Sequence, residues 1–286
     1  MVGRAIRRTV RFGIRNLPFP VLYEAFYQSA RALGIASYEV SGTYGRMFGS
    51  LYDQTAIKGY LRSRTWSPYI VSVLKGFFAA AGGGTFYDIG ANIGLITIPV
   101  AQDARVTCVA FEPDPENFRL LRTNLLCNCA HANVTAINAA VYVETTELRF
   151  SRSEYNSGDH HVAADGTMIV KAVTLDSKRP APGPFAVKID TQGAEPAVFA
   201  GGTKTLRNAD LIVAEFWPWG MSRLGLRPEP MISQINDIFT YGQIVEFDKP
   251  GAWLPVSAVT NRLREIVSIG GEHDTVDIVL SKRPML

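Results

Sequence analysis

The chain has 286 residues, of which 47% are hydrophobic and 19% are charged, and its formal net charge is +3. This composition excludes general disorder and fibrous repeats, and the length suits one α/β domain with an appended segment. Binding to nucleic acid requires clustered Lys and Arg rather than a small overall excess of positive charge. We therefore expect one compact fold that does not bind nucleic acid.

Two features predict a cytoplasmic protein. No apolar run reaches the roughly 18 residues of a membrane span, and the Arg-rich start lacks the apolar core of a secretory signal. The three cysteines are an odd number, which does not suggest a disulfide framework, so a reducing compartment is expected.

Residues 1–18 carry a local cluster of positive charge. Four arginines and four apolar residues each follow helical spacing: Arg4, Arg8, Arg11 and Arg15, and Ile6, Val10, Ile14 and Leu17. This pattern predicts a basic amphipathic helix that ends at Pro18. Such a helix either packs its apolar stripe on the rest of the protein or rests on an anionic membrane as a peripheral contact, and both interpretations stay open.

An alternation of short apolar strands and helical patterns begins after the glycines at 82–84. Strands are predicted at 85–89, 106–112, 134–140, 185–190, 211–216, 244–248 and 276–281, and helices at 93–102, 115–127, 196–206 and 231–239. Residues 83–286 are therefore predicted to form an α/β, Rossmann-like domain with a doubly wound, mostly parallel, seven-stranded sheet. The last two strands would form an antiparallel pair joined without a long helix. Helical patterns at 21–33 and 69–80 make residues 1–82 a predicted helical N-terminal cap.

The first strand of the domain ends in a glycine-containing turn, Asp88-Ile-Gly-Ala-Asn-Ile-Gly94. Ligands of doubly wound sheets bind at the carboxyl ends of the strands, and glycines allow a close approach of the backbone. A dinucleotide-binding turn would need a second glycine where Asn92 stands, and the Asp88 carboxylate would repel a pyrophosphate. A carboxylate instead suits a ligand that carries positive charge and no phosphate. S-adenosylmethionine, with its sulfonium and its α-amino group, is such a ligand.

The second strand ends in Phe111-Glu112-Pro113 and brings another carboxylate close to this turn. A carboxylate at this position can accept hydrogen bonds from both hydroxyls of a ribose. We therefore predict that Glu112 binds the ribose of S-adenosylmethionine.

Several segments together resemble the FkbM-type family of S-adenosylmethionine-dependent methyltransferases. They are 88–94, 111–113, 138–140, 188–195 and the strand that ends at Glu215, and the resemblance runs from about Tyr52 to Phe216. It implies a class I methyltransferase fold, S-adenosylmethionine as the methyl donor, and an oxygen acceptor in a sugar or secondary metabolite. The predicted donor-binding residues are Asp88, Gly90, Ala91, Asn92, Gly94, Phe111, Glu112, Pro113, Asn138 and Ala140.

Methyl transfer to a hydroxyl needs a group that removes the hydroxyl proton or a metal that acidifies it. Asp190 and Glu215 end neighbouring strands and would point into one crevice, where one acts as base or both hold a divalent ion such as Mg²⁺. No third protein ligand is evident, so a base is favoured over a metal. His160 and His161 are alternative bases because histidine titrates near neutrality. They lie in a polar segment, 151–170, that is expected to be a loop.

Other residues near the predicted crevice have two interpretations each. Lys188 alternates with Asp190 along its strand and either pairs with an acid or contacts the substrate. Trp217 and Trp219 would stack on a sugar or wall a hydrophobic acceptor, unless they belong to the core. Glu195, just before Pro196, either stabilises a helix N-terminus or has a functional role.

The sequence thus predicts an O-methyltransferase that uses S-adenosylmethionine and acts on a hydroxyl of a glycan, glycolipid or secondary metabolite. The Asp190-Thr-Gln-Gly193 segment differs from the Asn/Asp-Pro-Pro-aromatic motif of many amine methyltransferases, so nucleic-acid and protein amines are disfavoured as acceptors. One alternative is a non-catalytic cofactor-binding module of a membrane-associated glycan assembly. Another is a nicotinamide-dependent oxidoreductase, against which Asp88 and Asn92 argue.

Overall fold

The computed structural model describes residues 9–11, 21–129, 133–153 and 160–284. A large sheet forms its centre, with the strand order β14-β13-β16-β12-β11-β4-β5-β6 and with β15 beside β13. Seven of these strands are longer than two residues: β4 Gly84–Ile89, β5 Val106–Phe111, β6 Val134–Ile137, β11 Phe185–Ile189, β12 Leu211–Phe216, β13 Tyr241–Glu246 and β16 Val276–Ser281. The two short strands are β14 Lys249–Pro250 and β15 Leu254–Pro255.

Numbered along the chain, the seven long strands have the spatial order 3-2-1-4-5-7-6. All neighbouring pairs are parallel except those that involve β16, which runs antiparallel to both β12 and β13. From β4 the chain adds β5 and then β6 on one side of the sheet. It later returns to add β11 and then β12 on the other side of β4. The direction of strand order therefore reverses between β4 and β11, where doubly wound sheets bind their ligands. The predicted mostly parallel, seven-stranded sheet is confirmed.

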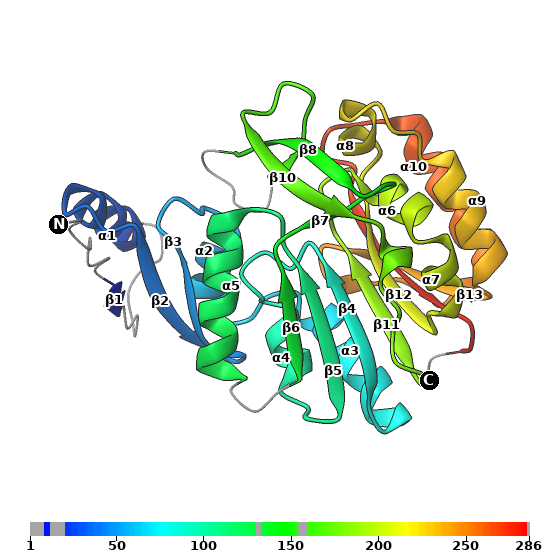
Figure 1. The fold of residues 1–286 in the computed structure, drawn as a ribbon, viewed down its shortest axis with the longest axis horizontal. Helices are drawn as coiled ribbons and strands as arrows, with labels where there is room; N and C mark the ends of the chain where they lie inside the picture. Colours follow the sequence, from blue (N-terminus) through cyan, green and yellow to red (C-terminus); the bar gives the residue numbers. More distant parts are fainter. Residues whose placement is uncertain (1–8, 12–20, 130–132, 154–159, 285–286) are drawn as a thin grey trace.

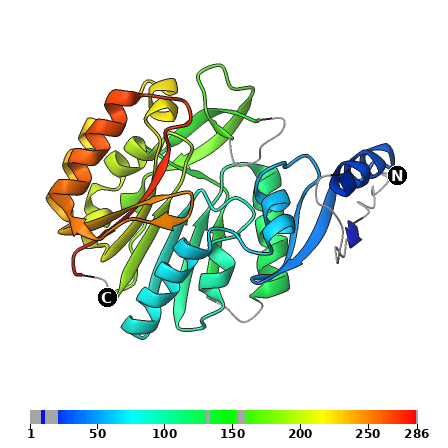
Figure 2. The same cartoon turned by 180° about the vertical axis from the view of Figure 1, so that it is seen from behind.

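Helices cover both faces of this sheet (Figures 1 and 2). On one face α3 Pro68–Ala81, α4 Thr97–Ala101 and α5 Pro115–Asn128 contact one another in series. On the other, α6 Glu195–Gly201 contacts α9 Glu229–Ile238, and α9 contacts α10 Val256–Ile269. Alternate residues of the central strands belong to two separate cores: Leu211 and Val213 to one, and Ile212 and Ala214 to the other. This is the pattern of a sheet that is buried on both faces.

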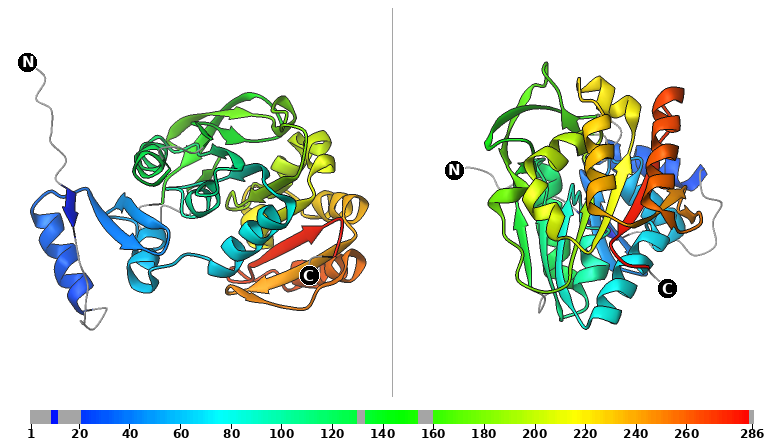
Figure 3. Two further views of the ribbon diagram at one scale, coloured as in Figure 1. Left: turned by 90° about the horizontal axis from the view of Figure 1, so that it is seen from below. Right: turned by 90° about the vertical axis from the view of Figure 1, so that its right-hand side faces the viewer.

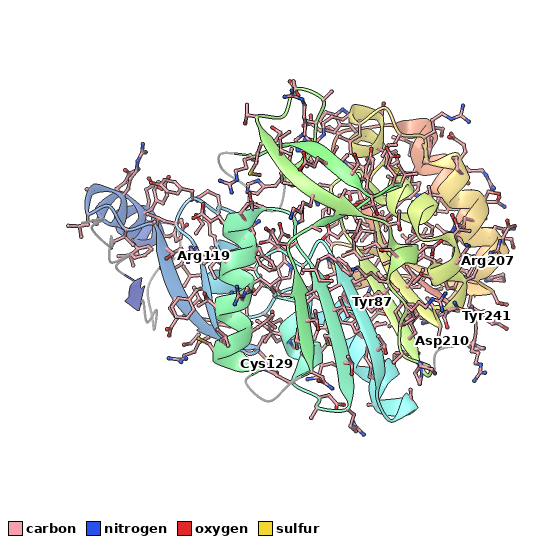
Figure 4. All side chains as sticks on the ribbon, viewed as in Figure 1. Tyr87, Arg119, Cys129, Arg207, Asp210 and Tyr241 are labelled. Carbon is pink, nitrogen blue, oxygen red and sulfur yellow. The ribbon has the colours of Figure 1, made fainter. Side chains whose placement is uncertain are left out.

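Aromatic packing and helix caps fix the centre of the sheet. Tyr87 lies on β4 (Figure 4). Its ring packs edge-to-face on Phe111 at 6.0 Å and on Phe185 at 5.0 Å between centroids. Helix α5 begins directly after β5 because Asp114 accepts hydrogen bonds from the backbone N–H groups of Glu116 and Asn117, at 2.8 and 2.9 Å. The loop after β5 is therefore held in a defined path.

The N-terminal segment differs from a purely helical cap. Its helices α1 Val21–Ala32 and α3 confirm the predicted ones, but an antiparallel hairpin, β2 Ser37–Gly42 and β3 Gly45–Ser50, precedes α2 Ala56–Ser63. The hairpin was not predicted because its sequence lacks a strict alternation of apolar and polar residues. The first four residues of β2 are all buried, so this strand has no solvent face that would produce such an alternation. This part of the chain stands at one end of the sheet (Figure 3) and shares a core with it. The division of the chain at residue 82 stays a prediction.

Most of the predicted basic helix at 1–18 lies outside the described residues. The three that are described, Thr9–Arg11, form the strand β1 on β2 and are not helical. Membrane contact through this segment stays a prediction. No helix in the described ranges has the length and apolar character needed to cross a membrane.

The polar segment at 151–170 is only partly a loop. It contributes to a small sheet of β7 Ala140–Val141, β8 Thr146–Ser151, β9 His161–Val162 and β10 Met168–Val173, which lies above the carboxyl ends of the central strands (Figure 1). The predicted 196–206 helix is divided into α6 and α7 Thr203–Asn208, and the short α8 Pro218–Arg223 follows β12. The prediction that no long helix joins the last two strands is wrong, because α10 lies between them.

Candidate active site

A cavity of about 400 Å³ opens at the carboxyl ends of the strands, where the strand order reverses. Its lining includes most of the predicted donor-binding residues: Gly90, Ala91 and Asn92 after β4, Phe111, Glu112 and Pro113 at the end of β5, and Ala140 in β7. Lys188, Asp190, Glu215 and His160 line the same cavity. The structure thus brings together residues that are more than 100 positions apart in the sequence.

The turn after β4 requires its first glycine. Gly90 has a φ of +80°, and a Cβ atom there would lie 1.8 Å from the backbone oxygen of Asp190. The N–H groups of Gly90 and Ala91 both donate to the oxygen of Phe111, at 3.0 and 2.9 Å. The turn is therefore held against the ends of both neighbouring strands, β5 and β11.

Asn92 takes the place of a dinucleotide-type second glycine and is suited to a polar ligand. Its φ of +49° is in the left-handed region, which Asn tolerates better than most residues. The Oδ1 atom is buried and meets no hydrogen-bond donor among the residues that the structure describes. A buried acceptor beside a cavity fits a cationic amino group, such as the α-amino group of S-adenosylmethionine.

Glu112 is fixed in place by two backbone groups. Its Oε2 accepts from the N–H of Asn92 and its Oε1 from the N–H of Asp114, both at 2.8 Å. Burial raises the pKa of Glu112 to about 8. Each carboxylate oxygen keeps a second lone pair, so both can also accept from a ribose hydroxyl. These residues therefore fit S-adenosylmethionine.

Three predicted donor-binding residues do not line the cavity. Asp88 is fully buried below the turn, where its Oδ2 accepts from Thr97 Oγ1 at 2.6 Å. Gly94 allows packing, since a Cβ there would lie 2.8 Å from Leu121 Cδ1. Asn138 supports the site from behind: its Nδ2 donates to the backbone oxygens of Glu112 and Pro113 at 2.8 and 2.9 Å. These contacts support the walls of the cavity, and direct contact of the three residues with the donor stays a prediction.

Lys188 connects the glycine turn to the acidic part of the cavity. Its Nζ donates to the backbone oxygen of Gly90 at 3.0 Å and lies 3.5 Å from Asp88 and 3.3 Å from Asp190. Burial opposes the charge, but the two carboxylates hold the pKa of Lys188 above its ordinary value. The interpretation of Lys188 as the partner of an acid therefore agrees with these contacts better than a substrate contact does.

The side chain of Gln192 bridges Asp190 and Glu215 in the cavity. Sequence analysis assigned no role to this residue. Gln192 has a φ of +57°, and its Nε2 donates to Asp190 Oδ1 at 2.9 Å and to Glu215 Oε2 at 3.0 Å. Burial and the nearby charge of Asp190 raise the pKa of Glu215 well above its usual range. The side chain of Glu215 is therefore a stronger base than an exposed carboxylate.

A further carboxylate, Asp277, was missed by sequence analysis. It lies in β16 directly opposite Glu215 in the strand register and lines the cavity. Burial raises the pKa of Asp277 to about 7. The only signal in the sequence is a lone acid in an otherwise apolar strand, Val276-Asp-Ile-Val-Leu280.

Of the predicted histidines and tryptophans, His160 lines the cavity, whereas His161, Trp217 and Trp219 do not. His160 lines the cavity and a second one of about 430 Å³ beside it, but its Nδ1 accepts from the N–H of Ser153 at 3.1 Å. His161 pairs with Ser151 in the small sheet and does not line the cavity. Trp217 and Trp219 also lie outside the lining, with Arg223 over both rings at 5.1 and 5.2 Å. These tryptophans were predicted from their closeness to Glu215 in the sequence. The chain turns into α8 directly after β12, and neither indole lines the cavity.

Two other predictions concern Glu195 and a metal. Glu195 is buried and accepts from the backbone N–H groups of Thr191 and Gly193, at 2.7 and 3.1 Å, which agrees with a structural role. In the described part of the chain no group of three or more His, Cys, Asp or Glu side chains is arranged to hold a metal. The amide of Gln192 also presents a donor between Asp190 and Glu215, where a cation would need an oxygen. Mg²⁺ at this pair stays an unfavoured prediction.

Comparison with known proteins identifies the family of this chain. The model of the methyltransferase FkbM domain matches residues 88–241, more than half of the chain. The hexuronic acid methyltransferase AglP of Haloferax volcanii is 29% identical over 133 residues, which are 45% of this chain and 54% of that protein. The chain therefore matches only about half the length of this relative.

Solved structures give weaker similarities. A putative O-methyltransferase from Klebsiella pneumoniae aligns over 93% of this chain and 92% of its own, with 13% identity and a TM-score of 0.42. The O-methyltransferase from Bacillus cereus in complex with SAH aligns over 80% and 88%, with 14% identity and a TM-score of 0.39. The fold assignment rests on the strand order of the central sheet.

The matched region contains the glycine turn, Glu112, Asp190 and Glu215, all of which contribute to the cavity. The chain belongs to the FkbM-type methyltransferase family and has the class I methyltransferase fold.

Proposed function

We propose that this protein transfers a methyl group from S-adenosylmethionine to a hydroxyl of a sugar, in a glycan, a glycolipid or a glycosylated metabolite. The observation that carries the proposal is the cluster of Asp190, Gln192 and Glu215 in the same cavity as the glycine turn and Glu112. A hydroxyl is a poor nucleophile until it loses its proton, and this cluster supplies a buried carboxylate for that step.

The donor end of the cavity would be formed by Gly90, Asn92 and Glu112. When bound, S-adenosylmethionine supplies a methyl group on a positively charged sulfur. Five carboxylates, with one lysine among them, lie in or directly below the cavity: Asp88, Glu112, Asp190, Glu215 and Asp277. A cationic ligand stabilises the ionised forms of these acids, so the cavity favours it over a neutral ligand of the same shape.

Glu215 is the base in this proposal. Asp190 is held by an ion pair with Lys188 and orients Gln192, which in turn orients Glu215. As the new bond between oxygen and the methyl carbon forms and the bond to sulfur breaks, the hydroxyl proton passes to Glu215. Most of the remaining rate enhancement comes from holding the oxygen in line with the methyl group.

The acceptor class is supported by the relative from Haloferax volcanii, whose name describes methylation of a hexuronic acid. The similarity covers about half of that protein, so it supports a sugar acceptor without specifying which sugar.

A direct test incubates the purified protein with S-adenosylmethionine carrying a radioactive methyl group and a panel of methyl glycosides. We expect label in a sugar product whose mass increases by one methylene, and base-stable label as expected of an ether. Label in a base-labile product would indicate an ester on a carboxylate instead. No labelled product from any sugar or from a metabolite extract, with donor binding intact, would contradict the proposal and favour the non-catalytic binding module.

A further inference from the structure

We propose that Trp66 and Ser67 form the acceptor-binding surface of this enzyme, with the indole as a platform for a sugar ring. The inference rests on the proposed sugar hydroxyl acceptor and names the part of the chain that would bind it. Both residues precede α3 and lie outside the region matched by the family model.

Their position is the first support. Trp66 and Ser67 line the same cavity as Asp190, Glu215 and Asp277. Asp248, just after β13, accepts from the N–H of Tyr69 in α3, and Val245 of β13 lies opposite Asp277 in the strand register. The start of α3 is therefore joined to the strand beside Asp277.

The indole of Trp66 is partly buried and packs against the core. Its ring lies beside Gly59 of α2, where a Cβ would lie 2.6 Å from Cζ3 of the ring. A partly exposed indole in the wall of a cavity is the type of surface on which the apolar face of a sugar stacks, with the ring N–H as a donor for a hydroxyl.

The backbone at Ser67 is strained. Its φ of +40° and ψ of 56° are left-handed, which is unfavourable for a residue with a Cβ atom, and more so before a proline such as Pro68. Strained residues persist where the surroundings over-determine them, and they gather at functional sites.

Two parts of the fold hold this conformation from opposite sides. In the β2–β3 hairpin, the Oη of Tyr44 donates to the backbone oxygen of Trp66 at 2.9 Å. The N–H of Thr43 donates to the backbone oxygen of Arg64 at 2.8 Å. On the C-terminal side, both oxygens of Asp248 accept from the N–H of Tyr69, at 3.0 and 3.1 Å. The β2–β3 hairpin of the N-terminal segment thus positions Trp66 at the cavity.

The test measures sugar binding independently of turnover. The probes are methyl β-D-glucopyranosiduronic acid and methyl β-D-glucopyranoside, titrated into protein saturated with S-adenosylhomocysteine and followed by saturation-transfer difference NMR. We expect Trp66→Ala to raise the Kd of the better-bound sugar roughly tenfold, and Trp66→Phe to raise it at most about threefold, because a flat ring is retained.

Matched variants separate this role from a loss of structure. Trp66→Leu keeps an apolar contact with Gly59 but lacks a flat face, so it should weaken sugar binding like Trp66→Ala. Trp253→Ala removes a partly buried tryptophan outside the cavity lining and should bind sugar like the wild type. Affinity for S-adenosylhomocysteine, measured by calorimetry, should stay within about twofold in all four variants.

Equal sugar binding by wild type, Trp66→Ala and Trp66→Leu would overturn the inference, as would an equal loss in Trp253→Ala or the failure of wild type to bind either sugar. Sugar binding that depends on Trp66 without methyl transfer to any sugar would support the acceptor surface and contradict the proposed function alone.

Discussion

The two ends of the cavity are built in different ways. The donor end consists of short continuous segments, 90–92 and 111–113, each at the end of a strand in the matched family region. The acidic end combines Trp66 and Ser67 from before the sheet, Asp190 and Glu215 from within it, and Asp277 from its last strand. The donor end can be recognised from local motifs, whereas Trp66, Ser67 and Asp277 at the acidic end cannot. These three residues lie outside the matched region, so under the proposed function they would adapt a shared family site to its acceptor.

The largest expected effect concerns the acidic end. Glu215→Gln keeps the shape of the side chain and removes the base, so kcat should fall by roughly 10²- to 10⁴-fold. Affinity for S-adenosylhomocysteine should change little, because the substitution leaves Gly90, Asn92 and Glu112 intact. Glu229→Gln, at an exposed site in α9, is the control. If Glu215→Gln retains activity within a few-fold, another group acts as base, and Asp190→Asn becomes the next variant to measure.

The donor end should respond in the opposite way. Glu112→Ala removes an acceptor for the ribose and should weaken donor binding by about 1.5–3 kcal/mol, as expected for hydrogen bonds to a charged group. Calorimetric titration of S-adenosylhomocysteine gives this value directly, and the KM of the acceptor should hardly change. A loss of acceptor affinity with donor affinity intact would reverse the assignment of the two ends.

Much of the donor end could be predicted because its chemistry lies in consecutive residues. Gly90, Asn92 and Glu112 were identified from their places at strand ends, and the strand order that brings them together follows from the alternation of strands and helices. Trp66 and Asp277 could not be found in this way, since their place in the site depends on tertiary contacts of the β2–β3 hairpin and on the antiparallel direction of β16. Trp217 is close to Glu215 in sequence but does not line the cavity, so its contact with the acceptor stays a prediction.

Both ends contain buried carboxylates, and this predicts an unusual pH dependence of stability. Burial raises the pKa to about 8 for Glu112 and to about 7 for Glu195 and Asp277, against roughly 4 in an unfolded chain. The folded protein therefore binds more protons than the unfolded chain between these values, and the free energy of unfolding should fall as pH rises from about 4 to about 8. Thermal unfolding of the ligand-free protein at constant ionic strength should show a decreasing Tm over this range. A Tm that rises between pH 5 and pH 8, the range in which these acids titrate, would show that they are not buried as described.

The smallest expected effect tests the strain at Ser67. Ser67→Gly relieves the left-handed backbone and should raise the free energy of unfolding by about 1 kcal/mol, measured by urea denaturation. Ser268→Gly, at an exposed helical position in α10, should lower it by a similar amount. Destabilisation by Ser67→Gly would mean that the local backbone is not strained.

Calorimetric titration of S-adenosylmethionine into the purified protein tests the donor site most directly. We predict saturable binding at one site per chain, weakened in Glu112→Ala, and no heat from NAD under the same conditions. Absence of heat from both S-adenosylmethionine and S-adenosylhomocysteine, or equal binding of NAD, would contradict the assignment of this cavity.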